Sequence, residues 1–148
     1  MATVEDLAVE REIEAVRQNA ELHGWPFERV GPRVFRVTLT ARNGDTYQIE
    51  VECENFPVRP AAFHWRNQES GQLDDPADSP APYGFFHDTG RVCAPWNRLA
   101  STEGGPHLEW VQSNWMQQPE TKGTVKLAAM VMRLHHELRS QQYGGRRQ

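Results

Sequence analysis

The chain has 148 residues, of which 38% are hydrophobic and 24% are charged, and its net charge at pH 7 is −4. This length and composition predict one soluble globular domain with a proper hydrophobic core. The negative charge argues against binding to nucleic acid or to an anionic membrane surface, because both are themselves negative, and no apolar run approaches the roughly 18 residues of a membrane span.

Residues 1–14 carry acidic side chains where a signal peptide would carry a basic patch and an apolar stretch. We therefore expect a cytoplasmic protein. In a reducing compartment the two cysteines are expected to be free thiols rather than a disulfide. The six histidines show no recognisable ligand spacing, so neither a metal nor another cofactor is predicted.

The first predicted element is a helix over about residues 4–23. Thr3 and Asp6 form a capping-box pattern at its start, and Gly24 followed by Pro26 ends it. Between these signals the apolar residues recur at steps of three and four, which predicts one buried stripe. The stripe consists of Val9, Ile13, Val16 and Ala20.

Four strands are predicted to follow the helix. A short strand at residues 27–30 ends at a Gly-Pro pair, and a second strand covers residues 34–41. The sequence Asn43-Gly44-Asp45 marks a hairpin turn. Residues 47–54 then alternate between apolar and polar side chains, which is typical of an antiparallel strand with one buried face. Residues 61–65 form the predicted fourth strand.

The second half of the chain is predicted to be irregular until its last helix. Residues 68–122 are rich in Trp, Pro and Gly, and we expect Trp96, Trp110 and Trp115 to anchor these loops to the core. The proline-rich run at 74–84 is predicted to be an extended surface loop with few hydrogen bonds. A helix is predicted at 124–141. Residues 142–148 are expected to be a flexible tail of the single domain 1–148, and the element order predicts an α+β fold.

The two cysteines lie in different sequence contexts. Cys53 falls on the apolar face of the third strand, where a thiol acts as a small buried hydrophobe with a raised pKa. Cys93 lies in irregular chain, in the stretch GFFHDTGRVCAPWN at residues 84–97. His87 and Arg91 are near it in sequence and would lower its pKa if they were also near it in space. Residue chemistry alone leaves open whether Cys93 is reactive or a filler.

The order of elements, together with four short motifs, resembles the ubiquitin-conjugating (E2) enzymes. The segment FPVRP at residues 56–60 is similar to the Tyr/Phe-Pro-x-x-Pro link between the third and fourth strands of that family, and Phe63 with Trp65 follows in the fourth strand. The segment GRVC, which ends at Cys93, resembles the Gly-x-Ile/Val-Cys motif at the active-site cysteine. Trp115 with Pro119 resembles the Trp-x-Pro element before the following helix. The resemblance spans about residues 4–138.

This resemblance implies a UBC-like fold and acyl transfer through a thioester. The thiolate of Cys93 would accept a ubiquitin-like protein from an E1-like enzyme, and an amine on a target protein would then attack the thioester. The short chain is most similar to compact bacterial E2-like proteins that are encoded beside E1-like and ubiquitin-like partners, some of them in antiphage defence operons. By the same resemblance, the first helix and the first loop between strands would meet the E1-like enzyme.

One departure from the family concerns the His-Pro-Asn motif upstream of the cysteine, whose Asn supports the oxyanion. Here His87 is followed by Asp88 and Thr89. His87, Asn97 or the backbone N–H groups of residues 92–94 are therefore candidate oxyanion donors. Asp88 is a candidate base for the incoming amine.

Two other functions remain open at this stage. The chain could be a non-catalytic E2-variant module that binds a ubiquitin-like protein without a covalent step. It could also be a small thiol hydrolase, with Cys93 as the nucleophile and His87 or His107 as its base.

Overall fold

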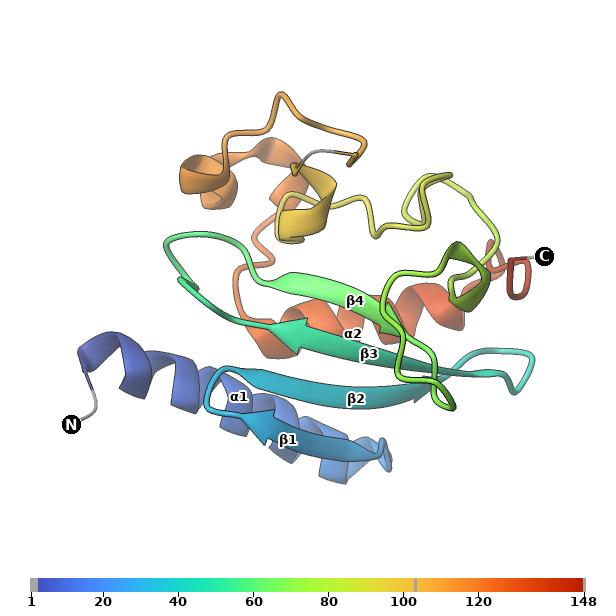
Figure 1. Cartoon of the computed structure of the whole chain (residues 1–148), viewed down its shortest axis with the longest axis horizontal. Coiled ribbons are helices and arrows are strands. Elements are labelled where there is room, and N and C mark those ends of the chain that lie inside the picture. The colour runs from blue at the N-terminus through green and yellow to red at the C-terminus, as the bar shows by residue number, and fades with distance from the viewer. Residues whose placement is uncertain (1–2, 103, 148) are drawn as a thin grey trace.

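The computed structural model describes residues 3–102 and 104–147. Its elements follow the chain as α1 (Val4–His23), the strands β1 (Phe27–Gly31), β2 (Val34–Thr40), β3 (Thr46–Glu52) and β4 (Ala62–Arg66), and α2 (Leu127–Leu138). Four short 3₁₀ turns lie between β4 and α2: η1 (Pro76–Asp78), η2 (Arg98–Ala100), η3 (Gln112–Gln117) and η4 (Pro119–Thr121). The fold is α+β: in chain order, a helix comes first, the four strands of the sheet follow, and a second helix comes last (Figure 1).

Helix α1 has the predicted bounds. The Thr3 hydroxyl accepts a hydrogen bond from the Asp6 backbone N–H, and an Asp6 carboxylate oxygen accepts one from the Thr3 N–H, so the capping box is formed. Gly24 adopts the left-handed conformation that ends the helix. The four residues of the predicted apolar stripe are the buried residues of this helix.

The strands form one antiparallel sheet in the order β1-β2-β3-β4. Val37 pairs with Ile49, and Ile49 pairs with Trp65, so apolar side chains share one face across three strands. The opposite face is polar, as the pairing of Arg36 with Glu50 illustrates. The predicted alternation of apolar and polar side chains, with one buried face, is therefore confirmed.

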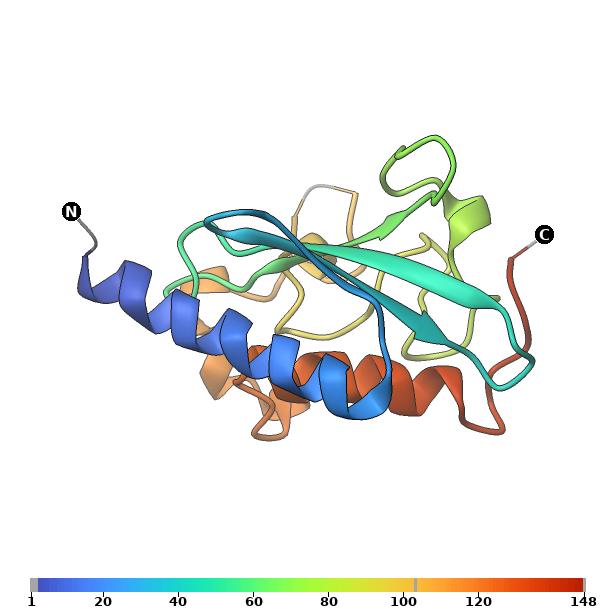
Figure 2. The same ribbon diagram turned by 90° about the horizontal axis from the view of Figure 1, so that it is seen from below.

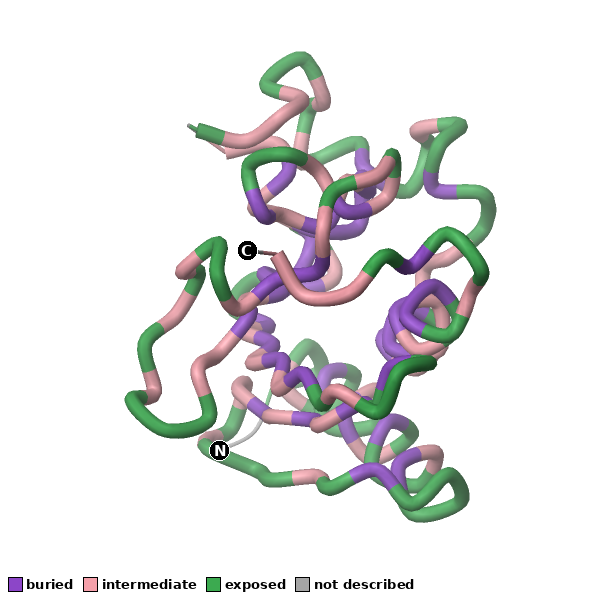
Figure 3. The backbone as a smooth tube through the Cα atoms, turned by 90° about the vertical axis from the view of Figure 1, so that its right-hand side faces the viewer, coloured by how far each residue is buried: buried purple, intermediate pink, exposed green. Residues whose placement is uncertain are grey.

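Both helices pack against the apolar face of the sheet and lie beside each other (Figure 2). Figure 3 shows buried stretches in the interior of the molecule and exposed stretches at its periphery; on α1 only the stripe that faces the sheet is buried. Most of the described chain between β4 and α2 lies beyond the β4 edge of the sheet (Figure 1).

Helix α2 is shorter than the predicted 124–141. Lys126 is extended, and the first free backbone N–H of the helix, at Leu127, donates to a Glu12 carboxylate oxygen at 2.9 Å. The helix start is thus set by a side chain from α1, which local sequence does not reveal. At the other end Arg139 is the capping residue, and the chain then turns toward the sheet.

The proline-rich run and the tail both differ from expectation, because they pair with each other. The Ala81 N–H donates to the Gly145 carbonyl oxygen, and the Arg147 N–H donates to the Ser79 carbonyl oxygen, both at 2.8 Å. Tyr143 is buried, and its hydroxyl lies 2.7 Å from the hydroxyl of Tyr47. Residues 143–147 therefore pack onto the sheet rather than fray, and the proline-rich run is hydrogen-bonded.

The tryptophan prediction holds for two of three residues. Trp96 and Trp115 are buried in the core. Trp110 instead lies partly exposed and stacks on His107, with ring centroids 4.0 Å apart. Over the described ranges 3–102 and 104–147, no helix is long and apolar enough to cross a membrane, and the same residues contain no metal-competent group of three or more His, Cys, Asp or Glu side chains.

Candidate active site around Cys93

Cys93 lies at the base of a short hairpin. Phe86 bridges Val92 in antiparallel fashion, and the Cys93 N–H donates to the Phe85 carbonyl oxygen at 2.8 Å. Further along the hairpin, the His87 N–H donates to the Arg91 carbonyl oxygen at 3.0 Å. Gly90, with a φ of 86°, forms the turn that a side chain would disfavour. Cys93 is therefore held by backbone pairing although it lies outside the sheet.

Asn97 ties this hairpin to the edge of the sheet. Its side-chain oxygen accepts a hydrogen bond from the Phe63 N–H in β4 at 3.0 Å, and its side-chain nitrogen donates to the Val92 carbonyl oxygen at 3.0 Å. The same oxygen caps the η2 turn through the Leu99 N–H at 3.3 Å. The amide thus joins β4, the residue before Cys93 and the turn after it.

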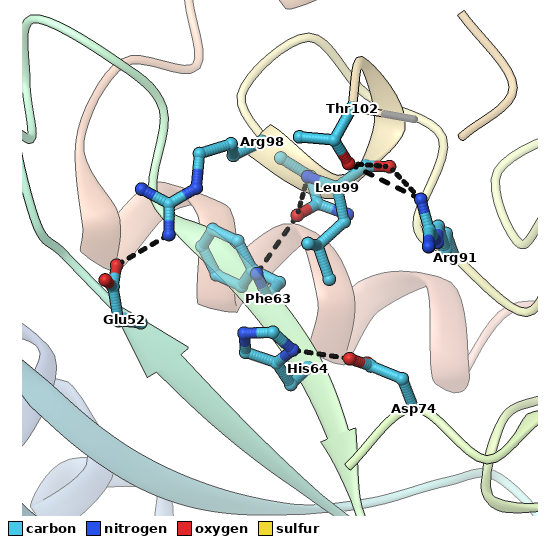
Figure 4. A network of polar contacts seen from close by, with 9 residues as sticks. Glu52, Phe63, His64, Asp74, Arg91, Arg98, Leu99 and Thr102 are labelled. Carbon is cyan, nitrogen blue, oxygen red and sulfur yellow. Dashed lines mark hydrogen bonds and ion pairs between the residues drawn. The ribbon is translucent and has the colours of Figure 1, made fainter. Parts of the chain in front are cut away.

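Charged side chains around η2 reinforce this connection (Figure 4). Arg98 pairs with Glu52 of β3 at 2.8 Å, and its backbone N–H donates to the Ala61 carbonyl oxygen. Arg91 donates to the Leu99 carbonyl oxygen at 2.9 Å. The segment that follows Cys93 is therefore fastened to the strands by both backbone and side-chain bonds.

The Cys93 side of the hairpin opens into a pocket of about 210 Å³. Three segments distant in sequence form its wall: the hairpin, the η4 turn and helix α2. The residues that line it are Gly84, Phe85, Cys93, Ala94, Trp96, Glu120, Lys122 and Arg133. A partly exposed cysteine thus shares a small pocket with one glutamate, one lysine and one arginine.

A network of contacts orients Arg133 toward this pocket. Its guanidinium carbon lies 4.7 Å from the centroid of the Phe85 ring, a cation–π geometry. Its Nε donates to Glu137 at 3.0 Å, and the Tyr83 hydroxyl donates to the other oxygen of the same carboxylate at 2.7 Å. Because Glu137 is nearly buried, these two bonds hold the carboxylate and, through it, the arginine.

The electrostatic setting of Cys93 differs from the sequence expectation. Burial raises the pKa of its thiol, and the negative charge of Glu109 raises it further. Neither His87 nor Arg91 contributes to this shift, because His87 lies along the hairpin from Cys93 and Arg91 is bonded to η2. The condition under which these two residues would lower the pKa of Cys93 is therefore not met, and the pKa is raised instead.

Cys53 behaves as predicted. It is fully buried, with 0% of its surface exposed, and burial raises the pKa of its thiol to about 12. Both cysteines are free thiols.

The other sequence-predicted site residues, His87, Asp88 and Asn97, do not line the pocket of Cys93. The His87 ring accepts a bond from the Thr89 N–H within its own turn, and Asp88 is exposed at the hairpin tip. Asp88 lies three pairing steps from Cys93, or about 10 Å along the strand direction. Asn97 is fully buried, with both ends of its amide bonded internally. These bonds give Asn97 a positioning role, and its role as a direct oxyanion donor stays a prediction.

Two of the three backbone donors proposed for the oxyanion are also occupied. The Cys93 N–H is bonded to Phe85, and the Ala94 N–H donates to the Val92 carbonyl oxygen at 3.2 Å. The polar groups that share the pocket are instead Glu120, Lys122 and Arg133, which sequence reasoning missed. Lys122 could have been noticed as one of only two lysines, but only the tertiary structure places these residues beside Cys93.

Comparison of the chain with protein-family models, curated proteins and solved structures finds no match. The coarse α+β architecture is evident from the structure alone.

Proposed function

We propose that this chain is an E2-like conjugating enzyme with a UBC-like fold. It accepts a ubiquitin-like protein from an E1-like enzyme as a thioester on Cys93 and transfers it to an amine of a target protein in the cytoplasm. The observation that carries this proposal is the pocket, where Cys93 is partly exposed beside ionisable side chains while Cys53 is sealed in the core.

The contact between two motifs that carry the family resemblance supports the proposal. The Trp115 indole N–H donates to the Pro57 carbonyl oxygen at 2.9 Å, and the Trp115 ring lies 6.0 Å from that of Phe56. Segments 56–60 and 115–119 are therefore in direct contact.

The raised pKa of Cys93 suits a thiol that stores an acyl group. A thiolate with a higher pKa is a poorer leaving group, so transfer from a lower-pKa thiol onto Cys93 is favourable and the resulting thioester resists loss. The same shift leaves little thiolate at neutral pH. A base in the complex with the E1-like enzyme would therefore have to take the thiol proton during loading.

In the transfer step the target amine attacks the thioester carbonyl, and negative charge develops on the carbonyl oxygen. We assign Arg133 to stabilise this oxyanion, because its held guanidinium lines the pocket. Glu120, which lines the pocket while Asp88 does not, would receive the proton from the amine. Cys93 leaves as the thiolate.

The two alternative functions, a thiol hydrolase and a non-catalytic module, need different residues in the pocket. A thiol hydrolase needs a base near its cysteine, but no histidine occurs among the described residues that line the pocket. The geometry therefore disfavours that function. A non-catalytic module needs no base, and it remains the alternative that the experiment below distinguishes. A role in bacterial antiphage defence rests on the family resemblance alone.

The test is a non-reducing gel of the chain with an E1-like enzyme and a ubiquitin-like protein encoded beside it, plus ATP. Wild type and Cys53→Ala should form a thiol-sensitive adduct that Cys93→Ala cannot form, while Cys93→Ser should form a thiol-resistant ester. Binding of the ubiquitin-like protein without any adduct would instead establish the non-catalytic module.

A further inference from the structure

The chain is nearly devoid of side-chain amines. Its 16 basic residues include only two lysines, Lys122 and Lys126, and the remaining fourteen are arginine. A guanidinium stays protonated in proteins and is not a nucleophile, whereas a deprotonated lysine attacks acyl groups. Almost the whole basic surface is therefore inert toward a thioester, and any self-acylation of a side-chain amine is confined to two positions.

The two lysines occupy different places. Lys122 lines the 210 Å³ pocket together with Cys93 and Glu120. Lys126 lies at the start of α2, where its ammonium pairs with Glu12 of α1 at 3.3 Å, and it does not line that pocket. Within the described ranges, the Lys122 ammonium has no hydrogen-bond or ion-pair partner of its own. Its position, rather than its chemistry, distinguishes it from Lys126.

The backbone of Lys122 adopts a strained conformation. It follows the η4 turn with φ 52° and ψ 39°, a left-handed conformation that usually favours Gly, Asn or Asp. The other described non-glycine residues with positive φ are Asn55 and Asp74. A side-chain hydrogen bond holds the η4 turn in place, because the buried Thr121 hydroxyl donates to the Trp115 carbonyl oxygen at 2.6 Å. A lysine at such a position is uncommon, and strain of this kind gathers at functional sites.

We propose that Lys122 is a built-in acceptor for the acyl group carried on Cys93. This inference rests on the proposed function, since it requires a thioester at Cys93. The neutral Nζ of Lys122 attacks the thioester carbonyl, the carbon–sulfur bond breaks, and an isopeptide bond to Lys122 forms. Cys93 leaves as a thiolate, and the surplus proton on the nitrogen passes to the Glu120 carboxylate.

The proximity of Lys122 to Cys93 favours this transfer over attack by external amines. An amine tethered beside the thioester acts at an effective concentration of about millimolar or higher, so it outcompetes dilute external amines. The product is an amide that thiols do not reverse and that fills the pocket beside the freed Cys93. A loaded enzyme without a target would thus modify and block itself, while a docked target amine would divert the acyl group.

The experiment bypasses the E1-like enzyme. The full-length chain is incubated with a short peptide that ends in Gly-Gly and is activated as a mercaptoethanesulfonate thioester. Adducts are then mapped by tandem mass spectrometry with and without thiol treatment. The variants are Lys122→Arg, which keeps the charge but removes the nucleophile, the matched control Lys126→Arg, and Cys93→Ala.

In the wild type, a thiol-labile adduct on Cys93 should convert into a thiol-resistant adduct on Lys122, at a first-order rate that does not depend on protein concentration. In Lys122→Arg the Cys93 adduct should live at least about tenfold longer, because a tethered amine exceeds solution nucleophiles in effective concentration. Lys126→Arg should behave as wild type, and Cys93→Ala should give no Lys122 adduct.

Each contrary outcome is separately informative. A Cys93 thioester that never moves to Lys122 overturns the acceptor role and leaves the proposed function intact. Modification of Lys122 in Cys93→Ala, or equal modification of both lysines in the wild type, overturns the transfer from Cys93. Failure of Cys93 to form any thioester, with this peptide and with the E1-like enzyme, overturns the proposed function and the acceptor role together.

Discussion

The side-chain nitrogen of Asn97 donates a hydrogen bond to the carbonyl oxygen of Val92 at 3.0 Å, while the side-chain oxygen of the same amide accepts one from the Phe63 N–H. One buried side chain therefore sets the distance between strand β4 and the peptide that precedes Cys93. The position of the thiol depends on an amide that does not itself line the pocket.

Replacing Asn97 with Ala should destabilise the fold by about 1–3 kcal/mol, because a buried N–H and a buried carbonyl lose their partner. Asn97→Asp keeps the acceptor for Phe63 but places a carboxylate against the Val92 carbonyl oxygen, so it should also destabilise. Urea unfolding measures both effects. Asn114→Ala, at an exposed position, is the control and should change stability by less than about 0.5 kcal/mol. Equal stability of all three variants would contradict the buried role of Asn97.

The two thiols should react at very different rates with an alkylating reagent. Cys93 is partly exposed, while Cys53 is sealed, with a pKa of about 12. In the native protein we expect only Cys93 to be labelled, and both cysteines to be labelled in urea. Because the pKa of Cys93 lies above its ordinary value of 9.0, its rate should keep rising as pH increases past 9. A rate that levels off near pH 7 would show the opposite pKa shift.

Glu109→Gln should make Cys93 more reactive. The variant removes a negative charge that raises the pKa of the thiol, while the effect of burial stays. The alkylation rate at pH 8 should therefore increase by a few-fold, and added salt should shrink the difference between variant and wild type. Glu69→Gln, in the exposed turn after β4, serves as the matched control. An equal increase in the control would rule out a local effect of Glu109.

Tyr143→Ala should destabilise the protein by about 3 kcal/mol, because it removes a buried ring from the core. Tyr143→Phe should cost about 1 kcal/mol, since it leaves the Tyr47 hydroxyl without that partner. Gln142→Ala, one residue earlier and exposed, should have no measurable effect. Thermal or urea unfolding measures all three variants. A frayed tail would instead make the Tyr143 variants as neutral as the control.

Because of the capping box, the stability of the fold should change with pH in the acid range. The Thr3 backbone N–H, and after it the Arg33 guanidinium, lower the pKa of Asp6 to about 2. A carboxylate with a lower pKa in the folded state stabilises that state above its unfolded pKa, and this contribution disappears as pH falls through the folded pKa. Asp6→Asn should therefore be less stable than wild type at pH 7, and the gap should close between about pH 4 and pH 2. Urea midpoints across this range test the prediction, which a constant gap would contradict.

The sequence by itself determined the elements whose signals are local. The bounds of α1 follow from its capping box, its apolar period and Gly24, all of which act within one or two helical turns. The third strand and the burial of Cys53 follow from alternation with period two. The departures begin where a partner is distant in sequence. Glu12 caps α2 across more than a hundred residues, and the tail pairs with the proline-rich run near Ser79.

Only the tertiary structure decided the surroundings of Cys93. The motif around this cysteine drew attention to His87 and Asp88 because they are near in sequence, but a hairpin carries its tip away from its base. The pocket is completed instead by residues of the η4 turn and α2, the first of which, Glu120, lies 27 positions after Cys93 (120 − 93). Packing of a helix against a sheet brings such segments together through burial of apolar faces. That interaction is non-directional, so it leaves no local signal of which polar residues will meet at its edge.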